Sequence, residues 1–367
     1  MVKIGILGGR LGEMNPAYPY RKWMDNVPDE HYDGDWILNE PSLVAAIEHK
    51  YKDAEVVYLK NFNEKTLQKN DVNFLVGVNL LNAWHTSPKM YEKWLKIMKN
   101  KRNNIYPPLS EQMFLYNKGD YLKYFEKRGI PIAPTFLIKT KKQRDPEKVI
   151  DQVKKSGWNS FVVKPDYAFA NIEIAKYELQ DSEVVVTDNY YSDDMSITEK
   201  SQTFYSELSD SNEKLVSKEL NKYLNLTKNF PGLVCQEKMK GFTRFWEIKS
   251  FWLNGEYKYH ICIKASGGLW GESESFGSIS KVDLERLKKL GKKVLKNMPE
   301  TKINGKIIKP LFVRIDFGCC QENSLDKTKY FLNEVEYAGC GTFTDVKNVF
   351  HHWPPVYYEK AKEISNS

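Results

Sequence analysis

The stretch YFLNEVEYAGCGTF, residues 330–343, decides the fold because it carries two carboxylates on a segment that otherwise has the apolar character of a buried strand. Glu334 and Glu336 stand two positions apart, so a strand would present both side chains on one face. Carboxylates this close repel each other unless a cation or a bound metal-phosphate complex lies against them. Mg²⁺ is the usual cation that carboxylate oxygens hold beside substrate phosphates, so the stretch predicts a metal-bound phosphate ligand.

A second apolar stretch, LFVRIDFG at residues 311–318, supports the same interpretation. Arg314 and Asp316 also share a strand face, so two neighbouring strands would form a floor that carries one arginine and three acids. The alternative stays open, because paired acids are common on the solvent face of a half-buried antiparallel strand. The prediction therefore depends on what precedes these two stretches.

The composition is ordinary for a globular protein. The chain has 367 residues, of which 41% are hydrophobic and 28% are charged, which is enough for two or three packed units. The net charge of +7 is spread along the chain without an arginine-rich block, which permits phosphate ligands but does not indicate nucleic-acid binding. No apolar run of about 18 residues could span a membrane, and the start MVKIGILGGR predicts a strand instead of a signal peptide. The five cysteines form no C-x-x-C pair, so we expect a soluble, cytoplasmic protein in a reducing compartment.

The N-terminal part predicts a small parallel sheet. Residues 2–7 form a short apolar strand that runs into glycines at 8, 9 and 12, without the complete G-x-G-x-x-G pattern of a nicotinamide site. Helices and strands then alternate, which is typical of α/β units. The expected elements are a helix at 42–52, strands at 54–60 and 73–79, and a helix at 87–100. We therefore expect an N-terminal α/β domain over residues 1–104.

Later in the chain, the acidic and serine-rich residues 190–202 predict a surface loop.

A family resemblance begins at Asn117-Lys118, which precedes a helix and then the sequence GIPIAPT at 129–135. It continues at residues 160–165, SFVVKP, an apolar strand that delivers Lys164 just before a proline. This order resembles the nucleotide-binding half of the ATP-grasp enzymes. The resemblance implies an ATP-grasp fold, α/β overall and α+β in the nucleotide-binding half. It also implies a central subdomain over residues 105–238 and a C-terminal subdomain over residues 239–367.

The resemblance implies that three lysines face the phosphates of ATP. They are Lys118, Lys164 and Lys264, the last of which we also expect to assist catalysis. A lysine on an apolar strand, such as Lys164, is costly to bury without an anion, although a lysine that ends a strand is also a common exposed edge residue. In this family a loop rich in glycine or serine then closes over the phosphates. Here residues 166–171, DYAFAN, contain no glycine, which restricts the backbone conformations available for cradling phosphate.

The adenosine half of ATP would lie along the next two strands. Residues 232–239, GLVCQEKM, resemble the segment that faces adenine, with Glu237 receiving the adenine amino group and Met239 packing on the base. Residues 247–264 then read as two strands joined by an Asn-Gly turn, which is a strong hairpin signal without any resemblance. On the resemblance, Glu247 binds the ribose hydroxyls. The alternative for each of these charges is a solvent-facing position on a strand.

The metal ligands of the family are an aspartate followed by Glu-x-Asn. Asp316 and Glu334 match this pattern, whereas Glu336 stands where asparagine is usual. The resemblance implies that the three acids hold two Mg²⁺ ions, with Mn²⁺ as an alternative. The additional carboxylate should attract the metal at least as strongly as an amide would. Cys340, in the loop that follows, is not required for this chemistry.

These features predict an ATP-dependent ligase that joins a carboxylic acid to an amine through an acylphosphate. Arg314 would stabilise the acylphosphate and then the oxyanion that forms when the amine attacks. The partners would be a small acid and a small amine, with neither nucleic acid nor membrane, and the oligomeric state stays open, a homodimer included. No Walker A sequence is present, which excludes a P-loop NTPase. Two alternatives remain: an ATP-grasp kinase that phosphorylates a hydroxyl group, and a nucleotide-binding regulatory protein without turnover.

Overall fold

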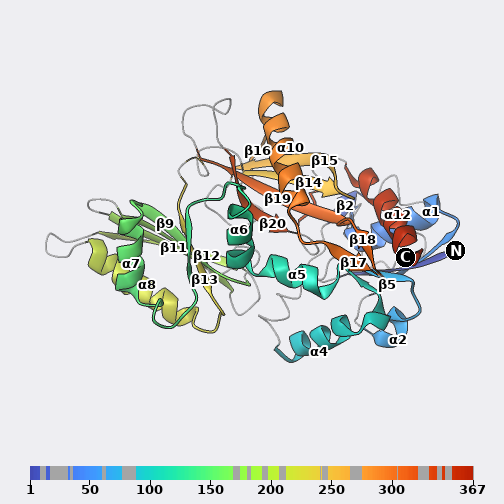
Figure 1. Cartoon of the computed structure of the whole chain (residues 1–367), viewed down its shortest axis with the longest axis horizontal. Helices are drawn as coiled ribbons and strands as arrows, with labels where there is room; N and C mark the ends of the chain where they lie inside the picture. The colour runs from blue at the N-terminus through green and yellow to red at the C-terminus, as the bar shows by residue number, and fades with distance from the viewer. Residues whose placement is uncertain are drawn as a thin grey trace.

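Three large sheets, each with its own strand order, follow one another along the described part of the chain (Figure 1). The structure is a computed structural model that describes residues 1–8, 14–16, 32–33, 36–59, 63–76, 88–167, 174–179, 183–191, 197–205, 212–239, 241, 247–264, 275–303, 305–320, 330–336, 341–343 and 349–366. In these residues no helix is both long enough and apolar enough to cross a membrane.

The first unit is built on a four-stranded parallel sheet in the order β5-β1-β6-β7. The predicted parallel sheet is therefore confirmed. Buried apolar residues such as Ile4, Ile6 and Phe74 form its centre. Its strands are β1 (Val2–Leu7), β5 (Ala54–Leu59), β6 (Val72–Leu75) and β7 (Ile105–Tyr106), and its helices are α1 (Asn39–Lys50), α2 (Glu64–Leu67) and α4 (Pro88–Lys99). A small sheet in the order β2-β4-β3 is formed by β2 (Met14–Pro16), β3 (Tyr32–Asp33) and β4 (Trp36–Leu38).

The second unit is a six-stranded antiparallel sheet in the order β12-β11-β10-β9-β13-β8. Helix α8 (Asn212–Leu226) packs on its strands, and α7 (Pro146–Lys155) packs beside α8, so that the apolar sides of both helices cover a separate core (Figure 1). The strands are β8 (Thr135–Ile138), β9 (Ser160–Pro165), β10 (Ala175–Leu179), β11 (Glu183–Tyr191), β12 (Ile197–Tyr205) and β13 (Leu233–Glu237).

The prediction of a surface loop over residues 190–202 is wrong at both of its ends. Strand β11 extends through Tyr191, and β12 begins at Ile197 and pairs with β11 over its whole length. Polar composition suggested a loop, but a strand at the outside of a sheet has no neighbour on one side and therefore tolerates polar residues.

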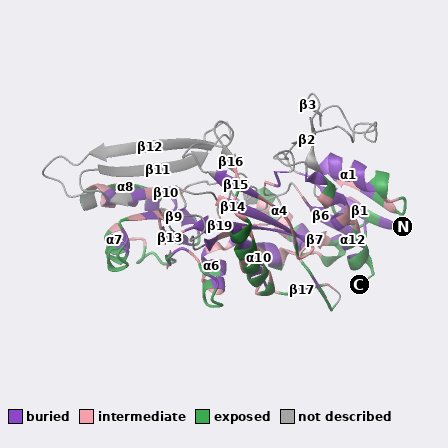
Figure 2. Cartoon of the chain, turned by 90° about the horizontal axis from the view of Figure 1, so that it is seen from above, coloured by how far each residue is buried: buried purple, intermediate pink, exposed green. Residues whose placement is uncertain are grey.

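The third unit is a five-stranded antiparallel sheet in the order β16-β15-β14-β19-β20. The predicted hairpin is confirmed: Asn254 (φ 52°) and Gly255 (φ 79°) both adopt the left-handed conformation that a tight two-residue turn requires. Helix α10 (Lys281–Lys296) covers this sheet, with its outer side exposed (Figure 2). The strands are β14 (Glu247–Leu253), β15 (Glu256–Lys264), β16 (Ser275–Gly277), β19 (Phe312–Cys319) and β20 (Tyr330–Glu336), and β17 (Thr301–Ile303) pairs with β18 (Lys306–Ile308).

Helices at two points join these units. Helices α5 (Leu109–Tyr116) and α6 (Lys118–Glu126) connect the parallel sheet to the six-stranded sheet. At the other end of the chain a short 3-10 turn (Phe350–His352) leads into α12 (Trp353–Ser365), which packs against α1, β1 and β6. The last helix therefore covers the first sheet, and one continuous apolar core runs from that sheet to the five-stranded one. The domain boundaries at 104/105 and 238/239 stay a prediction.

Candidate nucleotide and metal site

The two stretches with which the sequence analysis began are neighbouring strands, β19 and β20. Asp316 lies opposite Glu334 and Arg314 lies opposite Glu336, so the arginine and the three acids share one face of the sheet. All eight residues of β19 are buried. The predicted floor therefore forms: Arg314 and Asp316 are buried, and Glu334 and Glu336 are half-buried instead of facing solvent as the alternative interpretation required.

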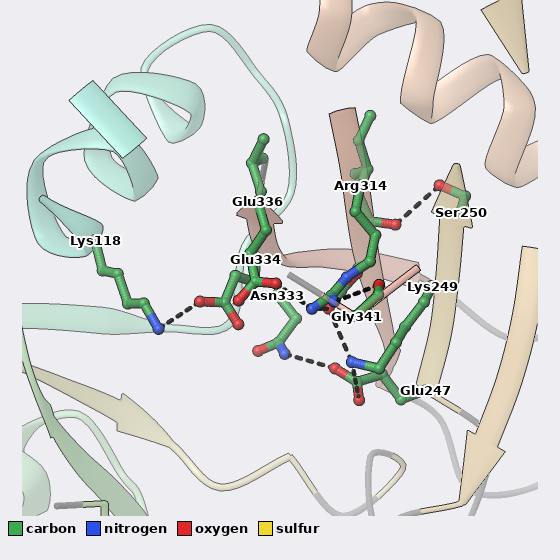
Figure 3. Close-up of polar contacts among 12 residues, drawn as sticks. Lys118, Glu247, Lys249, Ser250, Arg314, Asn333, Glu334, Glu336 and Gly341 are labelled. Carbon is green, nitrogen blue, oxygen red and sulfur yellow. Dashed lines mark hydrogen bonds and ion pairs between the residues drawn. The ribbon is translucent and has the colours of Figure 1, made fainter. Parts of the chain in front are cut away.

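Asp316 is the most enclosed acid of the floor, with no exposed surface. Its Oδ1 accepts a hydrogen bond from Nε of Arg314 (2.9 Å), and its Oδ2 accepts one from Nη2 of the same side chain (2.9 Å). Arg314 also contacts the carboxylate of Glu336 and donates to the carbonyl oxygen of Gly341 (3.1 Å) (Figure 3). The guanidinium group is thus fixed between two floor acids and the loop that follows β20.

Two further side chains of the floor were not predicted, namely Lys249 and Asn333. The ammonium group of Lys249 contacts Asp316 Oδ2 (2.9 Å) and Glu247 Oε2 (3.0 Å), while Asn333 Nδ2 donates to Glu247 Oε1 (3.1 Å) (Figure 3). Lys249 follows Glu247 by two positions, so strand alternation could have found it. Asn333 could not be found that way, because strict alternation places it on the face opposite Glu334. The β19–β20 register shifts between Asp316 and Phe317, and this bulge brings Asn333 to the site.

Two lysines reach the floor from the second unit and from the helices before it. Lys118 begins α6 and forms an ion pair with Glu334 Oε1, although this buried oxygen accepts no properly oriented hydrogen bond. Burial disfavours the charge of Lys118, but the carboxylates of Glu334 and Glu336 outweigh it and raise the pKa. Lys164 is 9% exposed near the end of β9, and burial together with the charge of Lys118 lowers its pKa to about 8. Lysines with this environment are suited to bind an anion.

The two glutamates of β20 have opposite pKa shifts. Burial raises the pKa of Glu334, but Lys118 and Lys164 outweigh it and lower the value to about 2. Burial raises the pKa of Glu336 to about 7, and the charges of Glu334 and Asp316 add to this effect against the opposing charge of Arg314. Neighbouring acids whose pKa values are driven apart are characteristic of functional sites.

No protein-family model matches the chain, and no curated protein sequence matches it. Solved structures match over nearly its whole length. A D-cycloserine synthetase aligns with a TM-score of 0.60 at 12% identity, covering 99% of each chain. The D-alanine–D-alanine ligase from Bacillus anthracis, complexed with ATP, aligns with a TM-score of 0.54 at 12% identity over 100% of this chain and 99% of that one. A RiPP-associated ATP-grasp ligase from Chryseobacterium gregarium aligns with a TM-score of 0.52 at 12% identity over 100% of this chain and 97% of that one.

The chain has the ATP-grasp fold. The predicted fold and the predicted resemblance are therefore confirmed.

Within the ATP-grasp fold, the residues predicted to face adenosine lie at the end of β13, just after it, and at the start of β14. Glu237 ends β13, is half-buried, and has a pKa raised by that burial. Met239 follows two positions later and is also half-buried. Glu247 begins β14 and joins the floor through Lys249 and Asn333. The roles of these residues toward adenine and ribose stay predictions.

Several predicted features fall at or beyond the edge of the described residues. Lys264 ends β15, where its backbone pairs with Ser275, but its side chain lies outside the described part of the chain. Cys340 and residues 168–171 of the glycine-free segment lie outside it as well.

The described start of the glycine-free segment is firmly held. Asp166 Oδ1 accepts the backbone N–H of Gly119 (2.7 Å), and the Asp166 N–H donates to Gly232 (3.0 Å). This connection joins the start of α6, which carries Lys118, to the end of β9, which carries Lys164.

The floor fits a hard cation by its chemistry. Carboxylate oxygens are the ligands that Mg²⁺ prefers, and Glu334 Oε1 is a buried carboxylate oxygen that forms an ion pair with Lys118. Among the described residues no three His, Cys, Asp or Glu side chains are already gathered as a metal cage, because lysine and arginine groups lie against the floor acids. Asp316, Glu334 and Glu336 are the residues of the floor that could hold a metal ion.

Proposed function

We propose that this protein is an ATP- and Mg²⁺-dependent ligase that joins a carboxylic acid to an amine. The observation that carries the proposal is the enclosed floor in which Arg314, Asp316, Glu334 and Glu336 share one face. Lys118 and Lys164, on two other elements, are placed at the same floor.

The site residues divide the work of binding ATP. Lys118 and Lys164 bind the phosphates, Glu247 accepts hydrogen bonds from the ribose hydroxyls, and Glu237 with Met239 faces the adenine. The four acids of the floor are balanced in charge by three lysines and Arg314, so that two Mg²⁺ ions, or Mn²⁺ in their place, would neutralise the triphosphate. Held by Asp316, Glu334 and Glu336, such ions would supply positive charge that stabilises the transferring phosphoryl group.

The chemistry has two steps, and neither requires a protein nucleophile. In the first, an oxygen of the substrate carboxylate attacks the γ-phosphorus, the bond to the β-phosphate oxygen breaks, and ADP leaves. In the second, the amine attacks the acyl carbon, phosphate leaves, and the nitrogen loses a proton. Arg314, whose orientation is fixed by Asp316 and Gly341, stabilises the acylphosphate and then the oxyanion. Lys264 would assist from the end of β15.

The structural relatives support this class of reaction without identifying its substrates. One is a D-alanine–D-alanine ligase complexed with ATP, and another is an ATP-grasp ligase in complex with ADP and a leader and core peptide. We infer that the partners of this chain are a small or peptidic carboxylic acid and an amine.

The test is nucleotide and phosphate release from ATP·Mg²⁺ in the presence of pooled amino acids, peptides and small carboxylic acids. Release of ADP and phosphate that requires both an acid and an amine, and that is lost in Glu334→Gln, supports the ligase. Glu256→Gln, at the exposed glutamate that begins β15, is the matched control and should retain activity. ADP without free phosphate, together with a phosphorylated alcohol, would indicate a kinase. ATP binding without ADP from any pool would indicate a regulatory protein.

A further inference from the structure

Lys249 is a buried lysine that lies between two acids with different proposed roles. Its residue is 9% exposed, and its Nζ lies 2.9 Å from Asp316 Oδ2 and 3.0 Å from Glu247 Oε2. Asp316 belongs to the proposed metal site and Glu247 to the proposed ribose site. One ammonium group therefore touches both halves of the proposed ATP site.

The strands fix this position. Lys249 is the residue of β14 that pairs directly with Asp316 of β19, and Glu247 lies two residues earlier on the same face. The Asp316 carboxylate is held from its other side by Arg314, and the Glu247 carboxylate is held from its other side by Asn333. Each acid is thus clamped between two donors, and Lys249 is the donor that the two clamps share.

We propose that Lys249 is a positioning residue that sets the separation of Glu247 and Asp316, and so makes nucleoside binding and metal binding depend on one side chain. The inference rests on the proposed function. Among the described residues each Glu247 oxygen has one protein donor and retains an acceptor position, so a ribose hydroxyl can bind to an oxygen whose direction is already set. Asp316 Oδ1 likewise retains an acceptor position beside its bond to Arg314.

The experiment separates the two halves of the site with two probes. Adenosine carries ribose and base without phosphates, so its dissociation constant from calorimetry reports the Glu247 side. The Mn²⁺ concentration that half-saturates the ATP-bound protein, followed by electron paramagnetic resonance, reports the Asp316 side. Neither readout requires turnover.

Lys249→Gln should weaken both probes, each by about 10- to 100-fold, the usual loss when a partner that orients a ligand is removed. Lys249→Arg should regain most of both affinities because it restores a cationic donor. Asn333→Ala removes a donor to Glu247 alone and should weaken adenosine while leaving Mn²⁺ unchanged. Lys360→Gln is the matched control, since Lys360 is a buried lysine paired with a glutamate on α12, away from the site.

Thermal unfolding of each variant without ligand distinguishes a loss of stability from a loss of affinity. A lower melting temperature for Lys249→Gln with both affinities unchanged in the folded protein would overturn the inference, because Lys249 would then only stabilise the fold. A change in one probe alone would overturn it as well. If the wild-type protein binds neither adenosine nor ATP·Mn²⁺, the proposed function fails together with the inference, whereas the two preceding outcomes leave that function intact.

Discussion

Nucleotide binding should reverse the lowering of the pKa of Lys164. Its pKa is lowered to about 8 by burial and by the charge of Lys118, against an ordinary value near 10.5. Between these values the unfolded chain binds a proton that the folded protein does not, so this group makes the free energy of unfolding increase with pH through that window. A triphosphate beside Lys164 acts in the opposite direction, because an anion favours the charged ammonium group.

We therefore predict that ATP affinity falls as the pH rises through 8, because binding must then restore the proton on Lys164. Calorimetry at pH 7.0 to 9.5 in buffers with different ionisation enthalpies would measure both the affinity and the protons taken up. The expected loss is about tenfold per pH unit at most, the limit for one linked proton. Lys164→Met should bind ATP weakly at every pH and show no proton uptake near pH 8. Uptake that persists in this variant would assign the proton to another group.

The folded structure disfavours the ionised form of Glu336. Its pKa is raised from 4.5 to about 7, and the largest cause is burial. Between these two pH values the folded protein therefore keeps a proton on Glu336 that the unfolded chain has already lost. Stability contributed by this group is present below pH 4.5 and is lost as the pH rises through 7. We predict that Glu336→Gln melts above the wild type by a margin that grows from pH 5 to pH 8, by about 2 °C or more.

Glu256→Gln supplies the contrast for the melting experiment. The pKa of this exposed glutamate is lowered, first by its hydrogen bond to Lys258, so its variant should show no growing margin. If the melting temperatures of the two variants relative to wild type changed equally with pH, Glu336 would not be the acid whose ionisation destabilises the fold.

At the scale of elements, α10 depends on one glycine for its approach to β14. A Cβ atom on Gly291 would lie 2.2 Å from Cζ2 of Trp252, a buried ring. Alanine is the better helix former by about 1 kcal/mol, but overpacking a core usually destabilises by about 1–3 kcal/mol. We predict that Gly291→Ala lowers stability to urea, against its helix propensity.

Two variants make the Gly291 prediction specific. Lys292→Ala, at the next and exposed position of α10, should be close to neutral. Trp252→Phe removes the crowding ring atoms, so the double variant should lose less stability than the two single variants together. If the losses of stability in the two single variants added up in the double variant, the new methyl group at position 291 would not be in contact with the ring of Trp252, and the prediction would be wrong.

Elements with one strong local signal were predictable from the sequence. The Asn254-Gly255 turn indicated a tight hairpin, and the structure forms it with both residues at positive φ. Strand alternation paired Arg314 with Asp316 and Glu334 with Glu336 on one face, as found. What alternation could not give was Asn333, because a bulge is a defect in the period on which such reasoning depends. The polar composition of residues 190–202 also led to the prediction of a loop where β12 begins.

At the scale of the whole molecule, α12 completes the N-terminal unit. Tyr357 is 2% exposed and meets the ring of Phe74 on β6 edge to face, with centroids 5.0 Å apart. Its neighbour Tyr358 stacks on Tyr51 and donates its hydroxyl to Asp53 at the surface. We predict that Tyr357→Ala destabilises by about 3–5 kcal/mol and Tyr358→Ala by about 1 kcal/mol.

Hydrogen exchange followed by mass spectrometry would locate the effect of Tyr357→Ala. Faster exchange should appear in β1 and β6 and not in the six-stranded sheet, which has its own core. Uniform acceleration across all three sheets would contradict this prediction and show that the units unfold together.

The position of α12 also has a consequence for synthesis on the ribosome. The two ends of this sequence lie on the same unit (Figure 1), and the helix that covers the first strand is translated after all three large sheets. Domains usually fold in the order in which they emerge. Here the sheet made first cannot bury its final face until α12 has emerged from the ribosome, so a polypeptide that stops before α12 would expose apolar surface to chaperones and proteases.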